Sequence, residues 1–197
     1  MGYYLLRLIL LVILKAMFRL KVEGLENLPQ KTNYIVVANH SSYLDPLALG
    51  VAIPKKIYWL TFRGLYNQPW LKWFLKATQT LPTGSASEKA LYLLNRNKNV
   101  GIFPEGSRSH DGKLRDFRSG AALLAIKTGR PIVPCAIFGT HDALPKSAKL
   151  PRLNPIKVKI GRPRYLLKKY EDRIDDMDLQ DGIFKVRNSI KEMINAG

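Results

Sequence analysis

The sequence predicts an α/β fold, in which a mixed, mostly parallel β-sheet is covered by helices. Short apolar runs rich in Val and Ile alternate along the chain with segments of helical periodicity. These runs are continuously apolar, as expected for strands that are buried on both faces. A chain of 197 residues, of which 46% are hydrophobic, is also long enough to bury one substantial core. We therefore expect a sheet with helices on its faces.

The N-terminal segment, MGYYLLRLILLVILKAMFRLK, is predicted to be a helix that lies in a membrane interface. Arg7 and Lys15 interrupt the apolar sequence, and the run 8–14 is far shorter than the roughly 20 residues that a spanning helix needs. On a helix, the cations share an arc of about 160°, from which they reach lipid phosphates. They are Arg7, Lys15, Arg19 and Lys21. Tyr3 and Tyr4 would lie near the interface, and a helix buried against the domain's own core is the alternative.

The rest of the chain predicts strands where Val, Ile and aromatic residues cluster, and helices between them. The expected strands are 33–38 (NYIVVA), 56–61 (KIYWLT), 99–103 (NVGIF), 131–138 (PIVPCAIF) and 156–160 (IKVKI). The expected helices are 45–53, 67–78, 86–97, 117–129 and 177–195. The stretch 144–155, which holds three prolines and three basic residues, is expected to be a solvated connection.

A second candidate for membrane contact is QPWLKWFLKA, at 68–77. On a helix, three aromatic side chains would share one face and two lysines another; they are Trp70, Trp73 and Phe74, and Lys72 and Lys76. Packing in the core explains such an aromatic stripe equally well.

Positive charge is the strongest bulk feature, because 32 Lys and Arg residues stand against 15 Asp and Glu, a net charge of +17. The stretch 171–197 has the opposite balance, with 4 basic and 7 acidic residues. The excess predicts an anionic partner, which is nucleic acid, an anionic membrane surface or a phosphorylated substrate. Charge alone does not choose among the three.

A polar turn, NHSSYLD, follows the first apolar run directly. In open α/β folds ligands bind at the carboxyl ends of strands, so we expect Asn39 and His40 at the mouth of a cleft. Asp45, in the first turn of the next helix, is placed to accept a hydrogen bond from one imidazole nitrogen. The other nitrogen is then free to take a proton. The alternative is a structural histidine followed by an ordinary helix N-terminal aspartate.

Two serines, Ser41 and Ser42, follow the histidine, so a nucleophilic triad is a competing interpretation. Neighbouring side chains diverge, however, and the sequence has no Gly-x-Ser-x-Gly elbow. A His/Asp dyad that activates a substrate hydroxyl is the better interpretation. Without an HExxH or paired-cysteine pattern, we expect no metal and no cofactor. The single cysteine, Cys135, is expected to be buried and inert.

A second polar turn, FPEGSRS, ends the apolar run 99–103. It clusters Glu105, Ser107 and Arg108, and Gly106 permits backbone N–H groups to approach a ligand. The Arg108 guanidinium offers a bidentate fork for a phosphate. The turn therefore predicts an anion site, with a salt-bridged surface turn as the alternative.

Together, NH-x4-D, FPEGSRS and GRPIVPCAIFGT resemble, in order, signature blocks of the glycerolipid acyltransferase family, typified by 1-acylglycerol-3-phosphate O-acyltransferase (lysophosphatidic acid acyltransferase). The resemblance covers about residues 20–165. It implies the fold of that family for an acyltransferase domain at 21–197, which follows the membrane-associating helix predicted above at 1–20. It also implies transfer of a fatty acyl group from a thioester to the free hydroxyl of 1-acylglycerol-3-phosphate, which makes phosphatidic acid in phospholipid biosynthesis.

The resemblance further implies roles for individual residues. His40 would be the general base and Asp45 its orienting carboxylate. Glu105, Gly106 and Arg108 match the block that holds the acceptor's phosphate end, and the full set of expected substrate-binding residues is Asn39, Arg63, Glu105, Gly106, Ser107 and Arg108. The segment 132–137, with Pro134, would be linked to the acyl donor or to the architecture of the site. A thioester is already activated, so one imidazole base that deprotonates a positioned hydroxyl is sufficient chemistry.

The chain departs from the family pattern at the second block. That block usually ends in an arginine that meets the acceptor phosphate, whereas the best match, TQTLPTG, has Gly84 there. Arg63 also stands where the family often has lysine. Arg63, Arg108 or Arg118 would supply the missing charge, and the identity of the acceptor stays open.

The expected partners are a lysophospholipid acceptor, acyl-CoA or acyl carrier protein, and an anionic membrane surface, with no nucleic acid. The expected location is the cytoplasmic face of the cell membrane, with monotopic association. An enzyme of the same family with another acceptor, such as another lysolipid or glycerol 3-phosphate, is one alternative. A basic nucleic-acid-binding or lipid-binding protein without catalysis is the other, although no helix-turn-helix, zinc-finger or RNP pattern occurs.

Overall fold

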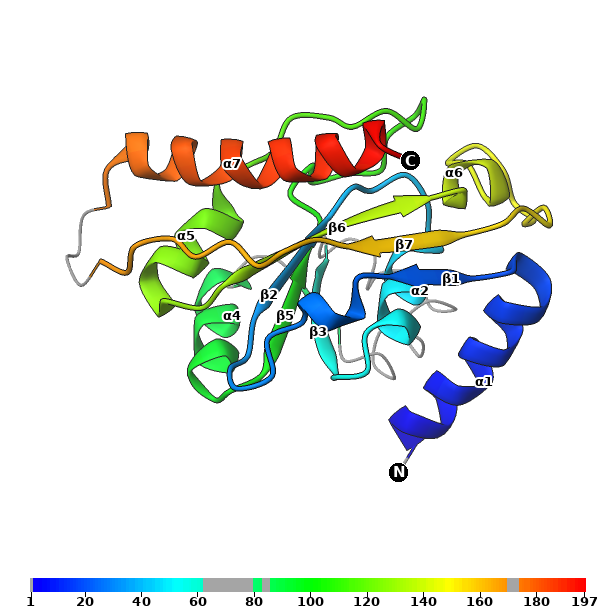
Figure 1. Cartoon of the computed structure of the whole chain (residues 1–197), viewed down its shortest axis with the longest axis horizontal. Coiled ribbons are helices and arrows are strands. Elements are labelled where there is room, and N and C mark those ends of the chain that lie inside the picture. The colour runs from blue at the N-terminus through cyan, green and yellow to red at the C-terminus, as the bar shows by residue number, and fades with distance from the viewer. Residues whose placement is uncertain (1, 62–79, 83–85, 170–173) are drawn as a thin grey trace.

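A seven-stranded sheet runs through the computed structural model, with helices on both faces (Figure 1). The structure describes residues 2–61, 80–82, 86–169 and 174–197. The strands are β1 (Lys21–Glu23), β2 (Ile35–Ala38), β3 (Ile57–Thr61), β4 (Leu81–Pro82), β5 (Asn99–Ile102), β6 (Ile132–Phe138) and β7 (Lys157–Ile160). Their order in the sheet is β1-β7-β6-β2-β5-β3-β4.

The strand directions confirm the mixed, mostly parallel sheet. The strands β6, β2, β5, β3 and β4 are parallel, whereas β7 runs antiparallel to β6 and pairs with β1 in parallel. At the centre, Val36 pairs with Gly101 on one side and with Val133 on the other. The carboxyl ends of β2, β5 and β6 therefore meet at one edge of the sheet.

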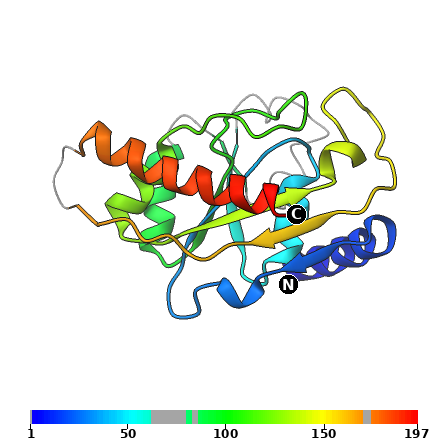
Figure 2. The ribbon, with the colours of Figure 1, turned by 45° about the horizontal axis from the view of Figure 1, so that its top comes forward.

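Helices cover the two faces in separate groups (Figures 1 and 2). The helices are α1 (Gly2–Phe18), α2 (Asp45–Ala52), α4 (Ala86–Asn95), α5 (Gly120–Thr128), α6 (Thr140–Ala143) and α7 (Asp176–Asn195), with a 3-10 turn η1 (Leu25–Asn27). Because strand side chains alternate between faces, Ile35 and Val37 pack with α4, α5 and α7. Val36 and Ala38 face the opposite way, toward α1 and α2.

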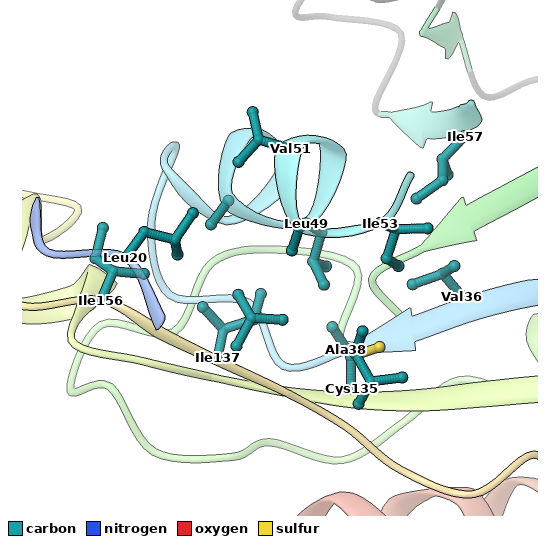
Figure 3. Packing of buried hydrophobic residues seen from close by; sticks show 14 of the residues in the cluster. Leu20, Val36, Ala38, Leu49, Val51, Ile53, Ile57, Cys135, Ile137 and Ile156 are labelled. Atoms are coloured by element: carbon teal, nitrogen blue, oxygen red, sulfur yellow. The ribbon is translucent and has the colours of Figure 1, made fainter. Parts of the chain in front are cut away.

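The core under α2 shows how this helix is fixed above the sheet. Leu49 and Ile53 point from the α2 side toward Val36 and Cys135, and all four side chains are buried (Figure 3). Burial raises the pKa of the Cys135 thiol, which favours an inert thiol as expected from the sequence. Packing on both faces of β2 gives the rigid support from which its carboxyl-end turn projects.

All five strands expected from the sequence are present. The helices expected at 45–53, 86–97, 117–129 and 177–195 are present with somewhat different ends, and the one expected at 67–78 lies outside the described residues. At α7, the Asp175 side chain accepts a hydrogen bond from the Met177 amide at 3.1 Å, which marks the start of the helix. The sequence did not predict β1, β4 or α6, which span three, two and four residues.

The first helix, α1, lies beside α2 and has two different long faces (Figure 1). Leu14 and Phe18 are buried in the core. Arg7 was expected to reach lipid phosphates, but its guanidinium instead donates to the carbonyls of Gly50 and Val51, at 3.3 and 2.7 Å. These carbonyls lie in the last turn of α2, where a cation is favoured by the helix dipole. The expected contact of Arg7 with lipid is therefore corrected. The placement of Arg19 and Lys21 on the same helix is also wrong, because α1 ends at Phe18 and Lys21 lies in β1.

The other long face of α1 is apolar and exposed. We call it the outer face of α1; its residues are Tyr4, Leu5, Leu8, Ile9, Val12, Ile13 and Met17. They recur at the three- and four-residue spacing of one helical stripe. Within the described residues, no helix combines the length and the apolar character needed to cross a bilayer.

Candidate active site

The two polar turns that the sequence singled out meet at the carboxyl edge of the sheet. The turn after β2 carries His40, and the turn after β5 carries Glu105. The His40 amide donates to Glu105 Oε1 at 2.8 Å, and the His40 carbonyl accepts from the Ser109 amide at 2.8 Å. The parallel pairing of β2 with β5 brings these segments, 65 residues apart, into contact. The backbone of His40 is thus held on both sides by the second turn.

His40 and Asp45 form the expected dyad. His40 Nδ1 lies 2.8 Å from Asp45 Oδ2, and the Asp45 side chain is completely buried. The same carboxylate oxygen accepts from the amides of Ser41 and Ser42, at 2.7 and 2.8 Å. An ionised carboxylate accepts hydrogen bonds only, so we assign the imidazole proton to Nδ1. Nε2 then carries the free lone pair, on a side chain that is 18% exposed.

Aromatic stacking fixes the plane of the imidazole. The His40 ring stacks on Phe103 with a centroid distance of 4.2 Å, and Phe103 stacks on Trp59 at 5.0 Å. Trp59 lies across Gly101 of the neighbouring strand, where an added Cβ would come within 2.4 Å of the indole. The glycine in β5 therefore makes room for the tryptophan that supports the stack. Sequence reasoning missed Phe103 and Trp59, although each lies in a segment that it predicted to be a strand.

Asn39 is bound to the sheet itself. Its Nδ2 donates to the Ile137 carbonyl at 3.0 Å, and its Oδ1 accepts from the Ile137 amide at 2.8 Å. Ile137 lies near the end of β6, so Asn39 links the turn after β2 to the neighbouring strand. Both polar atoms of the side chain are engaged, which favours a positioning role over contact with a substrate.

Glu105 is a buried acid that contacts the backbone of the dyad's histidine. Only 5% of the residue is exposed, and its Oε2 has no hydrogen-bond partner among the described residues. Burial raises the pKa of the Glu105 carboxyl to about 7, although the hydrogen bond from the His40 amide acts in the opposite direction. Because Glu105 Oε1 accepts the hydrogen bond from the His40 amide, Glu105 helps to fix the position of the histidine.

The rest of the FPEGSRS turn presents cations at its surface. Gly106 has a φ of 74°, in the region that favours glycine. Ser107 Oγ accepts from Arg115 Nη1 at 2.6 Å, and the Arg108 guanidinium lies 3.6 Å from the centre of the Tyr43 ring. Stacking on Tyr43 attaches Arg108 to the turn that carries His40. Arg63 and Gly84 lie outside the described residues.

Replacing Glu105 with Gln is expected to change how stability depends on pH. With the carboxyl pKa raised from 4.5 to about 7, the folded protein binds this proton more tightly than the unfolded chain does. The wild type therefore loses stability as the pH rises through this window, and Glu105→Gln does not. The unfolding free energy of Glu105→Gln, relative to wild type, should rise by about 2 kcal/mol from pH 5 to pH 8. Urea unfolding of both proteins at the two pH values measures it, and an unchanged difference would contradict the prediction.

A histidine that is oriented by a buried carboxylate, at the carboxyl ends of parallel strands, is chemically able to act as a general base. The chain belongs to the acyltransferase family, whose model matches residues 19–138. This confirms the resemblance seen in the sequence.

Individual relatives and a solved structure agree with the family. Over 141 residues the chain is 31% identical to the chloroplastic 1-acyl-sn-glycerol-3-phosphate acyltransferase LPAT1 of Arabidopsis thaliana, covering 67% of this chain and 39% of the relative. It is 33% identical to the 1-acyl-sn-glycerol-3-phosphate acyltransferase of Bacillus subtilis, covering 77% of each chain. The crystal structure of PlsC, the 1-acyl-sn-glycerophosphate acyltransferase of Thermotoga maritima, superposes with a TM-score of 0.71 at 26% identity, covering 95% of this chain and 80% of that one. The chain thus spans about half the length, or less, of several curated relatives.

Proposed function

We propose that the protein transfers a fatty acyl group from an acyl thioester to the free hydroxyl of 1-acylglycerol-3-phosphate, making phosphatidic acid. The observation that carries this proposal is the His40–Asp45 dyad beside the FPEGSRS turn. The chain's membership in the acyltransferase family supports it. So do the names of the relatives, which are 1-acyl-sn-glycerol-3-phosphate acyltransferases.

The chemistry follows from the free Nε2 of His40. As the acceptor hydroxyl attacks the thioester carbonyl, Nε2 takes the hydroxyl proton, and the buried Asp45 carboxylate stabilises the imidazolium that forms. The tetrahedral intermediate then collapses, the carbon–sulfur bond breaks, and the imidazolium returns the proton to the leaving thiolate. The products are an ester and a free thiol. This sequence of steps uses no covalent intermediate on the protein.

The acceptor is proposed to bind across the second turn. The Arg108 guanidinium, held on Tyr43 next to the dyad, is placed to meet a phosphate, and Gly106 and Ser107 offer the turn's backbone and hydroxyl. Arg63 is proposed to add a further cation. Within this proposal Asn39 and Glu105 hold the turn that carries the dyad in position.

The outer face of α1 supports association with a membrane. It forms a continuous exposed apolar stripe, and the exposed Lys15 lies beside it. The loop 144–155 lies at the same end of the molecule as the C-terminal end of α1 in both views (Figures 1 and 2). Two exposed leucines of this loop, Leu150 and Leu153, have Lys149 and Arg152 as neighbours in sequence. We propose monotopic attachment to the cytoplasmic face of the cell membrane, with the 1–20 segment as the main contact.

Charged substitutions on the outer face of α1 are expected to release the protein from lipid. Leu8 and Val12 are 56% and 59% exposed, so Leu8→Asp with Val12→Asp removes apolar surface without opening the core. Each leucine-sized side chain contributes about 1.5 to 3 kcal/mol when buried, so vesicle binding should weaken by about 100-fold or more. Sedimentation with anionic phospholipid vesicles measures this. A matched control is Leu167→Asp with Met177→Asp, at residues 87% and 77% exposed elsewhere.

If the α1 variant sediments with vesicles as the wild type does, the outer face is not the main contact. If the control loses binding equally, the effect is one of net charge and not of a specific face.

The reaction itself is tested by offering the purified protein several lysolipids and glycerol 3-phosphate, each with acyl-CoA or acylated carrier protein. Mass spectrometry of the products is expected to find phosphatidic acid as the main product. A main product formed from another acceptor would show that the proposed acceptor is wrong, whereas the proposed role of His40 as a general base would still stand. Nucleic-acid binding without any acyl transfer would overturn the proposal.

A further inference from the structure

A second basic cluster lies beside the FPEGSRS turn, with which it shares Glu105. A surface cavity of about 550 Å³ lies there, lined by Glu105, Leu114, Arg115, Asp116, Phe117, Arg118 and Arg187. We call it the arginine pocket. Its three arginines come from the segment after the turn and from α7, which are about 70 residues apart in sequence. Neither His40 nor Arg108 lines it, and it adjoins the phosphate site proposed above through the contacts of Arg118 with Gly106 and of Arg115 with Ser107.

The arginine pocket is built by contacts between its own lining residues. Arg187 Nε donates to the Arg115 carbonyl at 3.1 Å, and Arg187 Nη2 lies 3.3 Å from Asp116 Oδ1. Arg115 in turn donates to Ser107 Oγ. These bonds join α7 to the FPEGSRS turn and hold two guanidinium groups at the cavity. Only part of the donor capacity of each is used, because an arginine has five N–H donors.

Arg118 is the least engaged of the three arginines. Its guanidinium lies over Gly106, where an added Cβ would be 3.0 Å from both Nε and Cζ. Its amide donates to the Pro104 carbonyl at 2.9 Å, which fixes its backbone beside the turn. Among the described residues, its guanidinium forms no hydrogen bond and no ion pair. The N–H donors of the Arg118 guanidinium are thus available to a ligand in the cavity.

We propose that the arginine pocket binds a phosphate group of one of the enzyme's substrates, and this inference rests on the proposed function. Guanidinium groups bind phosphate oxygens through paired hydrogen bonds, and the arginine pocket presents three of them together. The phosphate belongs either to the lysophospholipid acceptor or to the phosphorylated carrier of the acyl donor. Glu105 connects the arginine pocket to the dyad, because its side chain lines the pocket and also accepts a hydrogen bond from the His40 amide.

The experiment compares Arg118→Ala and Arg115→Ala with wild type, and uses Arg162→Ala as a matched control. Arg162 is also exposed and lines a different cavity, beside α7 and Lys159. The Michaelis constants for a short-chain, monomeric 1-acylglycerol-3-phosphate and for acyl-CoA are measured separately. Calorimetry also measures binding of glycerol 3-phosphate and of coenzyme A in the absence of reaction, and thermal unfolding confirms that each variant is folded.

The expected result is a rise of about 10- to 100-fold in the constants for one of the two substrates, with the control unchanged. A rise confined to the acceptor and glycerol 3-phosphate assigns the pocket to the acceptor phosphate. A rise confined to acyl-CoA and coenzyme A assigns it to the carrier. Constants within about twofold of wild type in both folded variants, or equal losses for both substrates, would overturn the inference.

Failure of the proposed function gives a different result. In that case the wild type transfers no acyl group to any acceptor, whereas Arg118→Ala still weakens calorimetric binding of one of the two phosphate probes.

Discussion

Replacing His40 with Ala is expected to lower the rate of acyl transfer by about 10²- to 10⁴-fold, the usual contribution of a general base. The folded structure should persist, because the amide and carbonyl of residue 40 keep their bonds to Glu105 and Ser109. Loss of the stack on Phe103 costs about 0.5 to 1.5 kcal/mol. Initial rates at saturating thioester, together with thermal unfolding of the same preparation, measure both effects.

A matched control for this variant is His110→Ala. His110 is exposed, and its imidazole contacts Lys146 outside the dyad. We expect this control to turn over at the wild-type rate. Turnover of a folded His40→Ala variant within about fivefold of wild type would exclude His40 as the base, because a general base contributes at least about 10²-fold.

Asp45→Asn is expected to cause the second largest loss, with most of the activity removed. The substitution deletes the negative charge that stabilises the imidazolium formed during the reaction. Its amide oxygen can still accept from the Ser41 and Ser42 amides, so the turn keeps its backbone bonds. The new NH₂ group would stand at the position of Oδ1, which is buried and has no partner among the described residues. An unpaired buried donor costs about 1 to 3 kcal/mol, so stability should also fall.

The rate of Asp45→Asn, compared with its thermal unfolding, distinguishes this catalytic role from a purely structural one. If the Asp45 carboxylate stabilises the imidazolium, kcat/KM should fall strongly in a variant that is still folded at the assay temperature. A rate within a few-fold of wild type would show that Asp45 serves only as the first residue of α2.

The central strands were predictable from the sequence, because a strand that is buried on both faces has a continuously apolar sequence. β2 and β6 are such runs, and both were found with nearly their observed ends. β1 was missed because it has three residues, and its pairing partner is β7, more than 130 residues later. Neither the strand order nor the reversal of β7 is encoded in a local pattern, because both depend on how distant segments pack.

The dyad was predictable because its two members are local. His40 and Asp45 are separated by one turn, which begins at a strand end and finishes in the first turn of a helix. The bond from His40 to Glu105 joins two turns 65 residues apart, so the sequence suggested a ligand cluster but not this contact. Arg7 was predicted wrongly for the same reason. Its local sequence, an apolar helix with a cation, predicts contact with lipid, whereas its actual partners are carbonyls of α2, more than 40 residues away.

Whether His40 activates a lysophospholipid hydroxyl is tested most directly by following both products of one reaction. Wild type and His40→Ala are incubated with 1-acylglycerol-3-phosphate and acyl-CoA, and phosphatidic acid is counted by mass spectrometry and free thiol by a colorimetric reagent. We expect the wild type to make one phosphatidic acid for each thiol released, and His40→Ala to make almost none of either. Thiol release without phosphatidic acid, or equal yields from both proteins, would contradict the proposed reaction.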